Sequence, residues 1–205
     1  NHSLFLDFNE KVYSCGYNGS RQLGLENTNT LILTPEKSTC NLNNIVSISA
    51  GKDYSLFLDK YGKVYSCGYN LFGRLGLQHN SRNYFPTQIT SNIGHCNIVA
   101  ISAGTQHSLF LDLNGKVYSC GNNDVGQLGI GNTGSSTCNF PTQINNLSNI
   151  IAINAGFNHS LFLDSNGKVY GCGNNNVGQL GFENISIKYY LPVQITNNLN
   201  NSNIV

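Results

Sequence analysis

The side chains best able to do chemistry in this chain recur at nearly constant intervals. His2, His107 and His159 each begin the run His-Ser-Leu-Phe-Leu-Asp, and the second copy of that run begins with Tyr54. Imidazole nitrogens bind zinc, but a ligand set that exchanges His for Tyr changes its metal chemistry. Equivalent residues of a repeat also lie one unit apart instead of converging. We therefore expect structural rings, hydrogen-bonded to backbone, and no metal site.

A second recurring set is the cysteine after Val-Tyr-Ser or Val-Tyr-Gly. Its members are Cys15, Cys67, Cys120 and Cys172. Packed sheets lie about 10 Å apart, too far for thiolates that bind one zinc ion at about 2.3 Å. The seven Cys residues are an odd number without any Cys-x-x-Cys pair, which favours neither a disulfide framework nor a zinc site. We expect reduced, mostly buried thiols and a cytoplasmic or nuclear location.

An Asp ends each run that begins with His or Tyr, at a position typical of turns. These residues are Asp7, Asp59, Asp112 and Asp164. A carboxylate there can accept hydrogen bonds from turn N–H groups, which explains it without catalysis. The glycines near Gly121, Gly126 and Gly129 do not predict a phosphate loop, because no Gly-Lys-Ser or Gly-Lys-Thr follows and no helix is expected. Since catalytic residues are usually singular and not copied four times, we expect no enzyme and no cofactor.

The composition excludes several partners. Charged residues make up 10% of the 205 residues, against about 25% in an average soluble domain. Lys and Arg number 11 and Asp and Glu 10, for a net charge of +1. Nucleic-acid and membrane-surface binding need clustered positive charge, and a membrane span needs about 20 apolar residues in a row. We expect neither nucleic acid nor membrane to contact this segment.

The positions described above belong to a repeat that runs through the whole chain. The His or Tyr positions lie 52, 53 and 52 residues apart, and Val-Tyr-Ser-Cys-Gly and Leu-Gly recur with them. A fixed period near 50 residues is typical of propellers and solenoids. We expect a single repeat array over residues 1–205, with units at approximately 1–52, 53–105, 106–157 and 158–205.

Each unit has the pattern of four short strands. Residues 45–51 alternate apolar and polar side chains, and the Ser-Leu-Phe-Leu-Asp run suits a strand covered on both faces. Asn114-Gly115 and Asn166-Gly167 are typical hairpin turns before the next strand. Pro-Thr-Gln-Ile, at 86–89 and 141–144, predicts a short outer strand with Pro as its first residue. Four antiparallel strands per unit predict an all-β protein with four propeller blades in an arc.

The order of these motifs resembles the regulator of chromosome condensation repeat. The shared pattern is Ala-Gly, two variable residues, His-Ser-Leu, then Asn-Gly-Lys-Val-Tyr, Gly-x-Asn and Gly-Gln-Leu-Gly, across all four units. The resemblance implies a propeller that in the family typically has seven blades. Four units are present, and the first starts after the place of its Ile-x-x-x-Ala-Gly strand. We therefore expect an arc from a longer protein, or an incomplete propeller whose ends need covering.

The chain departs from the family pattern in ways that matter. It has no Trp, which removes the Trp-based light sensing that one plant branch of the family uses. The first unit is the loosest copy: Glu10 replaces the turn Gly, Arg21 replaces the Gly found at 73, 126 and 178, and Pro35-Glu36-Lys37 replaces Pro-Thr-Gln. This unit is expected to be a terminal-type blade or to bear a distinct contact surface.

The segments after each Leu-Gly vary most between units, at residues 25–34, 77–85, 130–140 and 182–191. We expect them to be loops clustered on one surface, where a rigid scaffold commonly places recognition. Aromatic residues and Arg are favoured interface anchors. The candidate partner-binding residues are Arg82, Tyr84, Phe85, Lys188, Tyr189 and Tyr190. The alternative is that these aromatic rings only cap the blade edges.

Two functions remain open at this point. One is a non-catalytic protein–protein interaction scaffold, which needs only the arc and its variable segments. The other, implied by the resemblance, is guanine-nucleotide exchange on a Ran-like small GTPase, with that GTPase as the partner. The founding exchange factor uses a hairpin wedge for which these repeat spacings leave no room. Chromatin binding would need a basic tail that this segment lacks.

Overall fold

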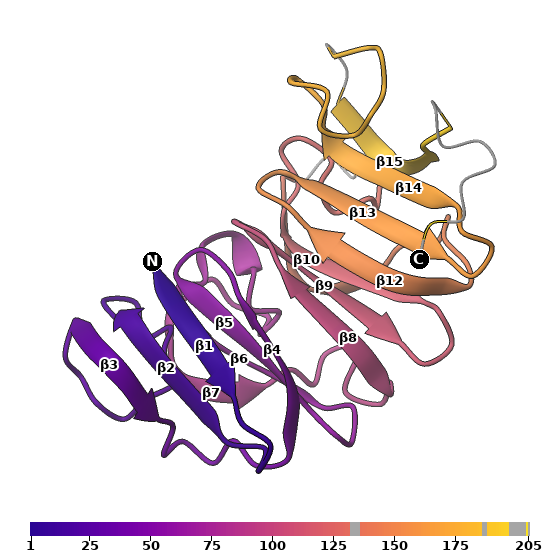
Figure 1. Cartoon of the computed structure of the whole chain (residues 1–205). Helices are drawn as coiled ribbons and strands as arrows, with labels where there is room; N and C mark the ends of the chain where they lie inside the picture. Colours follow the sequence, from indigo (N-terminus) through magenta and orange to yellow (C-terminus); the bar gives the residue numbers. More distant parts are fainter. Residues whose placement is uncertain (132–135, 186–187, 197–203, 205) are drawn as a thin grey trace.

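The repeat folds as four β-sheets that stack side by side into an arc (Figure 1). The computed structural model describes residues 1–131, 136–185, 188–196 and 204. Blade 1 contains β1 (His2–Leu6), β2 (Val12–Tyr17) and β3 (Leu31–Lys37), and blade 2 contains β4 (Ile45–Ala50), β5 (Tyr54–Asp59), β6 (Val64–Gly68) and β7 (Asn83–Gln88). Blade 3 contains β8 (Ile98–Ala103), β9 (His107–Asp112), β10 (Val117–Asn122) and β11 (Thr137–Gln143). Blade 4 contains β12 (Ile150–Ala155), β13 (His159–Asp164), β14 (Val169–Asn174) and β15 (Lys188–Gln194).

All strand pairs are antiparallel, and consecutive strands are neighbours within each blade. The predicted all-β blade architecture is confirmed. Blade 1 has three strands among the described residues, because the chain starts at the second strand of that repeat. Within the described ranges the single helical turn is η1 (Leu71–Gly73), and no helix there reaches the length and apolarity that crossing a membrane requires.

The sheets are offset from the sequence units. Strand β4 closes the first unit in sequence, yet it pairs with β5 and forms the inner edge of blade 2. The same offset recurs at β8 and β12. Each connection from β3, β7 or β11 to the next inner strand therefore crosses from one blade to the next.

The Asp side chains order the hairpins between the second and third strands, as expected. Oδ1 of Asp59 accepts hydrogen bonds from the N–H groups of Tyr61 and Lys63, both at 2.9 Å. Asp7, Asp112 and Asp164 make the same pair of bonds in their own turns. The repeated Asp therefore has a structural function in each hairpin.

The outer strands are longer than predicted. Strand β7 begins at Asn83, so Pro86 is its fourth residue and not its first. The register of the β6–β7 pair shifts between Ser66 and Gly68, and Pro86 lies in the resulting bulge. Because a bulged residue has no ladder hydrogen bond to lose, Pro is accommodated there and the strand continues through it. The prediction that Pro begins the strand is wrong.

The apolar core lies between the blades. Leu56, Leu58 and Val64 of blade 2 pack against Phe110 and Tyr118 of blade 3. Equivalent clusters join blade 1 to blade 2 and blade 3 to blade 4. Each blade thus has a front face, which packs on the following blade, and a back face, which packs on the preceding one.

The thiols differ from expectation in burial. All seven Cys are free, but only Cys67, Cys120 and Cys172 are buried. Cys15, on β2 of blade 1, is half-buried. The remaining three lie in the outer strand of blade 3 or in segments that connect blades. The prediction of mostly buried thiols is therefore wrong for four of the seven.

Candidate protein-interaction surface

The recurring His side chains join neighbouring blades. Nε2 of His2 lies 2.8 Å from Oγ of Ser55, and Nε2 of His107 lies 2.9 Å from Oγ of Ser160. Each Ser hydroxyl donates its own proton to a backbone carbonyl, that of Gln22 or Gln127, so it accepts from the imidazole N–H. The prediction that these rings bond to backbone is wrong, because each ring bonds to a Ser side chain of the following blade.

These imidazole rings are neutral at physiological pH. Burial lowers the pKa of His107 to about 3, with the charges of His159 and Arg74 adding to the effect. Burial lowers the pKa of His2 to about 4. No group of three or more His, Cys, Asp or Glu able to hold a metal occurs within the described ranges.

Blade 2 replaces this His–Ser bond with a different arrangement. The hydroxyl of Tyr54 donates to the carbonyl of His107 at 2.5 Å. Arg74 stands where the other units have Gln, and its guanidinium donates to the carbonyls of Lys52 and Thr105 at 3.3 and 3.0 Å. Its Cζ also lies 5.8 Å from the centre of the Tyr54 ring. Both departures from the repeat thus join blades 2 and 3.

The first cluster of predicted anchors lies on blade 2. Tyr84 and Phe85 belong to β7, and 53% and 56% of their surfaces are exposed. Arg82 comes just before the strand, donates from Nη1 to the carbonyl of Gly19 at 3.0 Å and lies over the ring of Tyr69. The expectation that these residues lie on a loop is wrong for Tyr84 and Phe85, because the outer strand starts earlier than predicted.

A groove between blades 1 and 2 lies beside these aromatic residues. Its volume is about 210 Å³. The lining residues are Arg21, Leu25, Glu26, Thr28, Tyr84 and Phe85. We call this the blade 1–2 groove. Of these six, Tyr84 and Phe85 were predicted as partner-binding residues, Leu25, Glu26 and Thr28 lie in the variable segment 25–34, and Arg21 departs from the repeat.

Arg21 occupies a position where two other blades have a glycine at close contact with the next blade. It has φ 65° where Gly73 and Gly126 have φ 79° and 89°. A Cβ atom at Gly73 would collide with the backbone of Asn139, and one at Gly126 would lie 2.6 Å from the carbonyl oxygen of Tyr189. The glycines therefore let the outer strand of the next blade approach closely. A side chain at position 21 requires that strand to stand further away.

A backbone hydrogen bond joins the blades at the equivalent place of the other two interfaces. The N–H of Gln78 donates to the carbonyl of Asn139, and the N–H of Gly131 donates to that of Tyr190, both at 2.9 Å. Glu26 is the residue of blade 1 equivalent to Gln78 and Gly131, since each lies three positions after the Leu of the repeated Leu-Gly pair. Glu26 lines the groove. A hollow of about 390 Å³ also lies at the blade 2–3 interface, lined by Gln78, Ser91, Asn92, Asn139 and Phe140. The blade 1–2 groove differs from it in its lining residues, which include two charged side chains and two aromatic rings.

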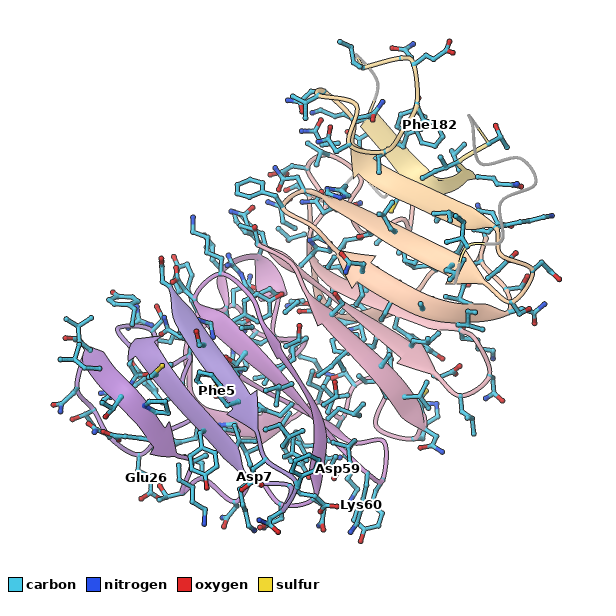
Figure 2. The ribbon with its side chains drawn as sticks, viewed as in Figure 1. Phe5, Asp7, Glu26, Asp59, Lys60 and Phe182 are labelled. Carbon is cyan, nitrogen blue, oxygen red and sulfur yellow. The ribbon has the colours of Figure 1, made fainter. Side chains whose placement is uncertain are left out.

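The second cluster of predicted anchors lies on β15 and contacts blade 3. Nζ of Lys188 lies 3.5 Å from the carbonyl oxygen of Asp124, and the hydroxyl of Tyr190 lies 3.4 Å from the same oxygen. The rings of Tyr189 and Phe182 lie 4.5 Å apart. Glu26 and Phe182, which mark the two clusters, lie at opposite ends of the arc in Figure 2. The structure does not bring the two clusters together.

These features define the class of the protein: a β-propeller array whose blades are joined by repeated side-chain bonds. The chain belongs to the RCC1-like domain family, since the family model described as RCC1-like domain matches residues 1–205. The resemblance stated from the repeats is confirmed.

Relatives and solved structures give the same result. The chain is 30% identical over 196 residues to the ultraviolet-B receptor UVR8 of Arabidopsis thaliana, covering 95% of this chain and 44% of that one. It is 31% identical over 193 residues to the secretion-regulating guanine nucleotide exchange factor of Bos taurus, covering 87% and 40%. The structure of Prp20p from Saccharomyces cerevisiae, a protein with binding properties to Gsp1p and histones, superposes with a TM-score of 0.81 at 27% identity, covering 96% of this chain and 49% of that one. The chain thus spans less than half the length of these relatives.

Proposed function

We propose that this chain is a non-catalytic protein-interaction scaffold and that the blade 1–2 groove, with Tyr84 and Phe85, forms its principal contact. The observation that carries the proposal is the placement of two adjacent, half-exposed aromatic side chains on a strand beside a groove that residues of both neighbouring blades line. Such a groove can take a side chain of a partner, and the aromatic rings supply a large apolar contact area.

The scaffold holds these anchors in place before a partner arrives. Tyr84 and Phe85 lie in the bulge of β7 between the paired residues Asn83 and Thr87, and Arg82 is held by the Gly19 carbonyl and the Tyr69 ring. Association therefore costs less side-chain ordering than it would on a free loop. Arg21 and Glu26 place one positive and one negative charge along the groove. These charges favour a partner segment whose polar groups complement them around an apolar side chain.

Lys188, Tyr189 and Tyr190 form a second proposed contact. The contact of Lys188 with the Asp124 carbonyl of blade 3 gives this side chain a structural role as well. Lys188 is exposed, so it also presents a positive charge to a partner. Because the two clusters lie at opposite ends of the arc, they would contact separate parts of a partner. The free state of all seven thiols fits a reducing compartment, and we keep the proposal of a cytoplasmic or nuclear location.

Guanine-nucleotide exchange on a Ran-like small GTPase is the second candidate function. It is favoured by the relative named as a guanine nucleotide exchange factor and by the structure of Prp20p, a protein with binding properties to Gsp1p. Exchange makes and breaks no covalent bond, so it would need only a surface that binds the nucleotide-free GTPase more tightly than the loaded one.

One experiment separates the two functions. A protein captured from extract with the whole chain is identified and purified, and its affinity for the chain is measured. In parallel, a Ran-like GTPase loaded with a fluorescent nucleotide is mixed with the chain. The scaffold proposal expects a partner whose affinity falls in the Phe85→Ala variant, without faster nucleotide release. If the chain accelerates nucleotide release and the Phe85→Ala variant accelerates it equally, exchange takes place through another surface and the groove is not the contact.

A further inference from the structure

A polar hollow lies between blades 2 and 3, the two middle blades of the arc (Figure 1). Its volume of about 390 Å³ falls within the range of about 300–1,000 Å³ that small-molecule sites have. Four neutral polar side chains and one aromatic ring line this blade 2–3 hollow: Gln78, Ser91, Asn92, Asn139 and Phe140. Because none of these described lining residues carries a charge, a charged ligand would find no counter-charge here, and the hollow suits an uncharged one.

The hollow takes the same place in the repeat as the blade 1–2 groove, with different side chains. Phe140 directly precedes the Pro of its outer strand, as Phe85 does in blade 2. One position earlier, Asn139 stands where blade 2 has Tyr84. One aromatic ring is therefore kept and the other is replaced by an amide, which exchanges apolar contact area for hydrogen-bonding groups.

Hydrogen bonds within the protein orient the three amide groups of the hollow. Nδ2 of Asn92 donates to the carbonyl of Pro141 at 2.8 Å. Nδ2 of Asn139 donates to the carbonyl of Gln78 at 3.2 Å, and Nε2 of Gln78 donates to Oγ of Ser91. No described residue donates to the oxygens of these three amides. Each amide oxygen is therefore left as an acceptor for a ligand.

Gln78 and Asn92 both have a left-handed backbone, with φ 63° and 56°. This conformation costs energy for a residue with a long side chain such as Gln. Gly131, the equivalent residue of blade 3, has φ 83° and takes the same conformation without that cost. Glycine would therefore satisfy the turn at position 78, whereas Gln places an amide in the hollow at a cost in stability. Strained residues of this kind cluster at binding sites.

The backbone on both sides of the hollow is fixed. A Cβ atom at Gly73 would collide with Cα of Asn139, so the glycine lets β11 lie directly against blade 2. The N–H of Gln78 also donates to the carbonyl of Asn139 at 2.9 Å. The acceptors are thus in place before a ligand arrives, which lowers the entropic cost of binding.

We propose that the blade 2–3 hollow binds the pyranose ring of a neutral sugar. A pyranose has a face of C–H groups, which can pack on the ring of Phe140, a side chain that is 41% exposed. The hydroxyl groups around the edge of the sugar can donate to the oriented amide oxygens of Gln78, Asn92 and Asn139. Phosphate and carboxylate groups supply acceptors only, so the same oxygens would repel them.

The test is an NMR titration of the whole chain with the methyl glycosides of glucose, mannose, galactose and N-acetylglucosamine. The proposal expects at least one glycoside to shift the amide signals of Gln78, Asn92 and Asn139, with a dissociation constant on the order of 1 mM for a ligand of this size. The 6-phosphate of the same sugar should bind about tenfold more weakly, because it adds an anionic group. If no glycoside shifts these signals at tens of millimolar, the proposal is overturned.

Two variants decide whether the hollow itself is the site. Phe140→Ala removes the stacking ring, and Gln78→Gly removes one acceptor while installing the residue that blade 3 has at the equivalent position. Each should weaken glycoside binding about tenfold. Gln78→Gly should leave unfolding nearly unchanged, because relief of backbone strain offsets the lost side-chain bond.

Phe85→Ala, the equivalent change in the blade 1–2 groove, is the matched control and should bind the glycoside like the parent. Failure of the hollow is therefore distinct from failure of the proposed partner groove. Parent-like glycoside binding in both Phe140→Ala and Gln78→Gly would overturn the proposal. Loss of the protein partner's affinity in Phe140→Ala would also overturn it, because the hollow would then belong to the protein contact.

Discussion

Nε2 of His107 lies 2.9 Å from the hydroxyl oxygen of Ser160, a residue 53 positions later on the next blade. The same bond joins His2 to Ser55. Each imidazole ring therefore connects two neighbouring blades. Its removal should lower the free energy of unfolding most where the neighbouring blade buries the ring fully.

His107→Ala is expected to lower the free energy of unfolding by about 2–4 kcal/mol, because it leaves a cavity and a buried Ser hydroxyl without its donor. His159→Ala, at the half-buried equivalent position of blade 4, should cost about 1 kcal/mol or less. Urea-induced unfolding of both variants measures the difference. Equal losses would mean that the bond to the next blade contributes nothing.

Acid should destabilise the fold through the same ring. The pKa of His107 is about 3 in the folded chain and about 6.5 when unfolded, so between these values only the unfolded chain binds the proton. The free energy of unfolding should therefore fall as pH is lowered from about 6.5, by up to about 1.4 kcal/mol per pH unit for this one group. His107→Gln should make the pH dependence of unfolding shallower over that window. An unchanged slope would contradict the assignment.

A pair of glycine substitutions should separate backbone strain from blade–blade contact. Gly126 and Gly178 both have positive φ, at 89° and 76°, but only at Gly126 would a new Cβ meet the next blade. Gly126→Ala should cost about 1–3 kcal/mol more than Gly178→Ala, because the outer strand must move away. Thermal unfolding of the two variants gives this difference directly, and a difference near zero would show that the strand yields without cost.

Arg21→Gly should narrow the blade 1–2 groove and remove the positive charge from its lining. With glycine at position 21, β7 can approach blade 1 as the outer strands of blades 3 and 4 approach theirs. Partner affinity is expected to fall about tenfold, or about 1.4 kcal/mol, although Tyr84 and Phe85 remain. Calorimetric titration of the partner into this variant measures the change. Parent-like affinity would show that the aromatic residues bind without the groove.

The repeat made most of the fold predictable, because periodic spacing, Asn-Gly turns and the Asp at each hairpin are local signals. The start of the outer strand was not predictable in that way, since the bulge that accommodates Pro86 depends on the pairing of β6 with β7. The partner of His107 was missed although Ser follows the His or Tyr in every unit, because the bond crosses to the next unit. The groove was partly signalled: Arg21 in place of Gly was visible, but its effect on the position of β7 requires the packed neighbour.

The central claim is that Tyr84, Phe85 and the adjacent groove bind a protein partner. Its most direct test is the dissociation constant of the purified partner for the parent chain, Tyr84→Ala, Phe85→Ala and the control Tyr61→Ala, which changes an exposed aromatic residue in a hairpin of the same blade. The account predicts a loss of about 2 kcal/mol, roughly thirtyfold in affinity, for Tyr84→Ala and Phe85→Ala, with parent-like binding for Tyr61→Ala and unchanged unfolding for all three. Parent-like affinity of both Tyr84→Ala and Phe85→Ala would contradict it.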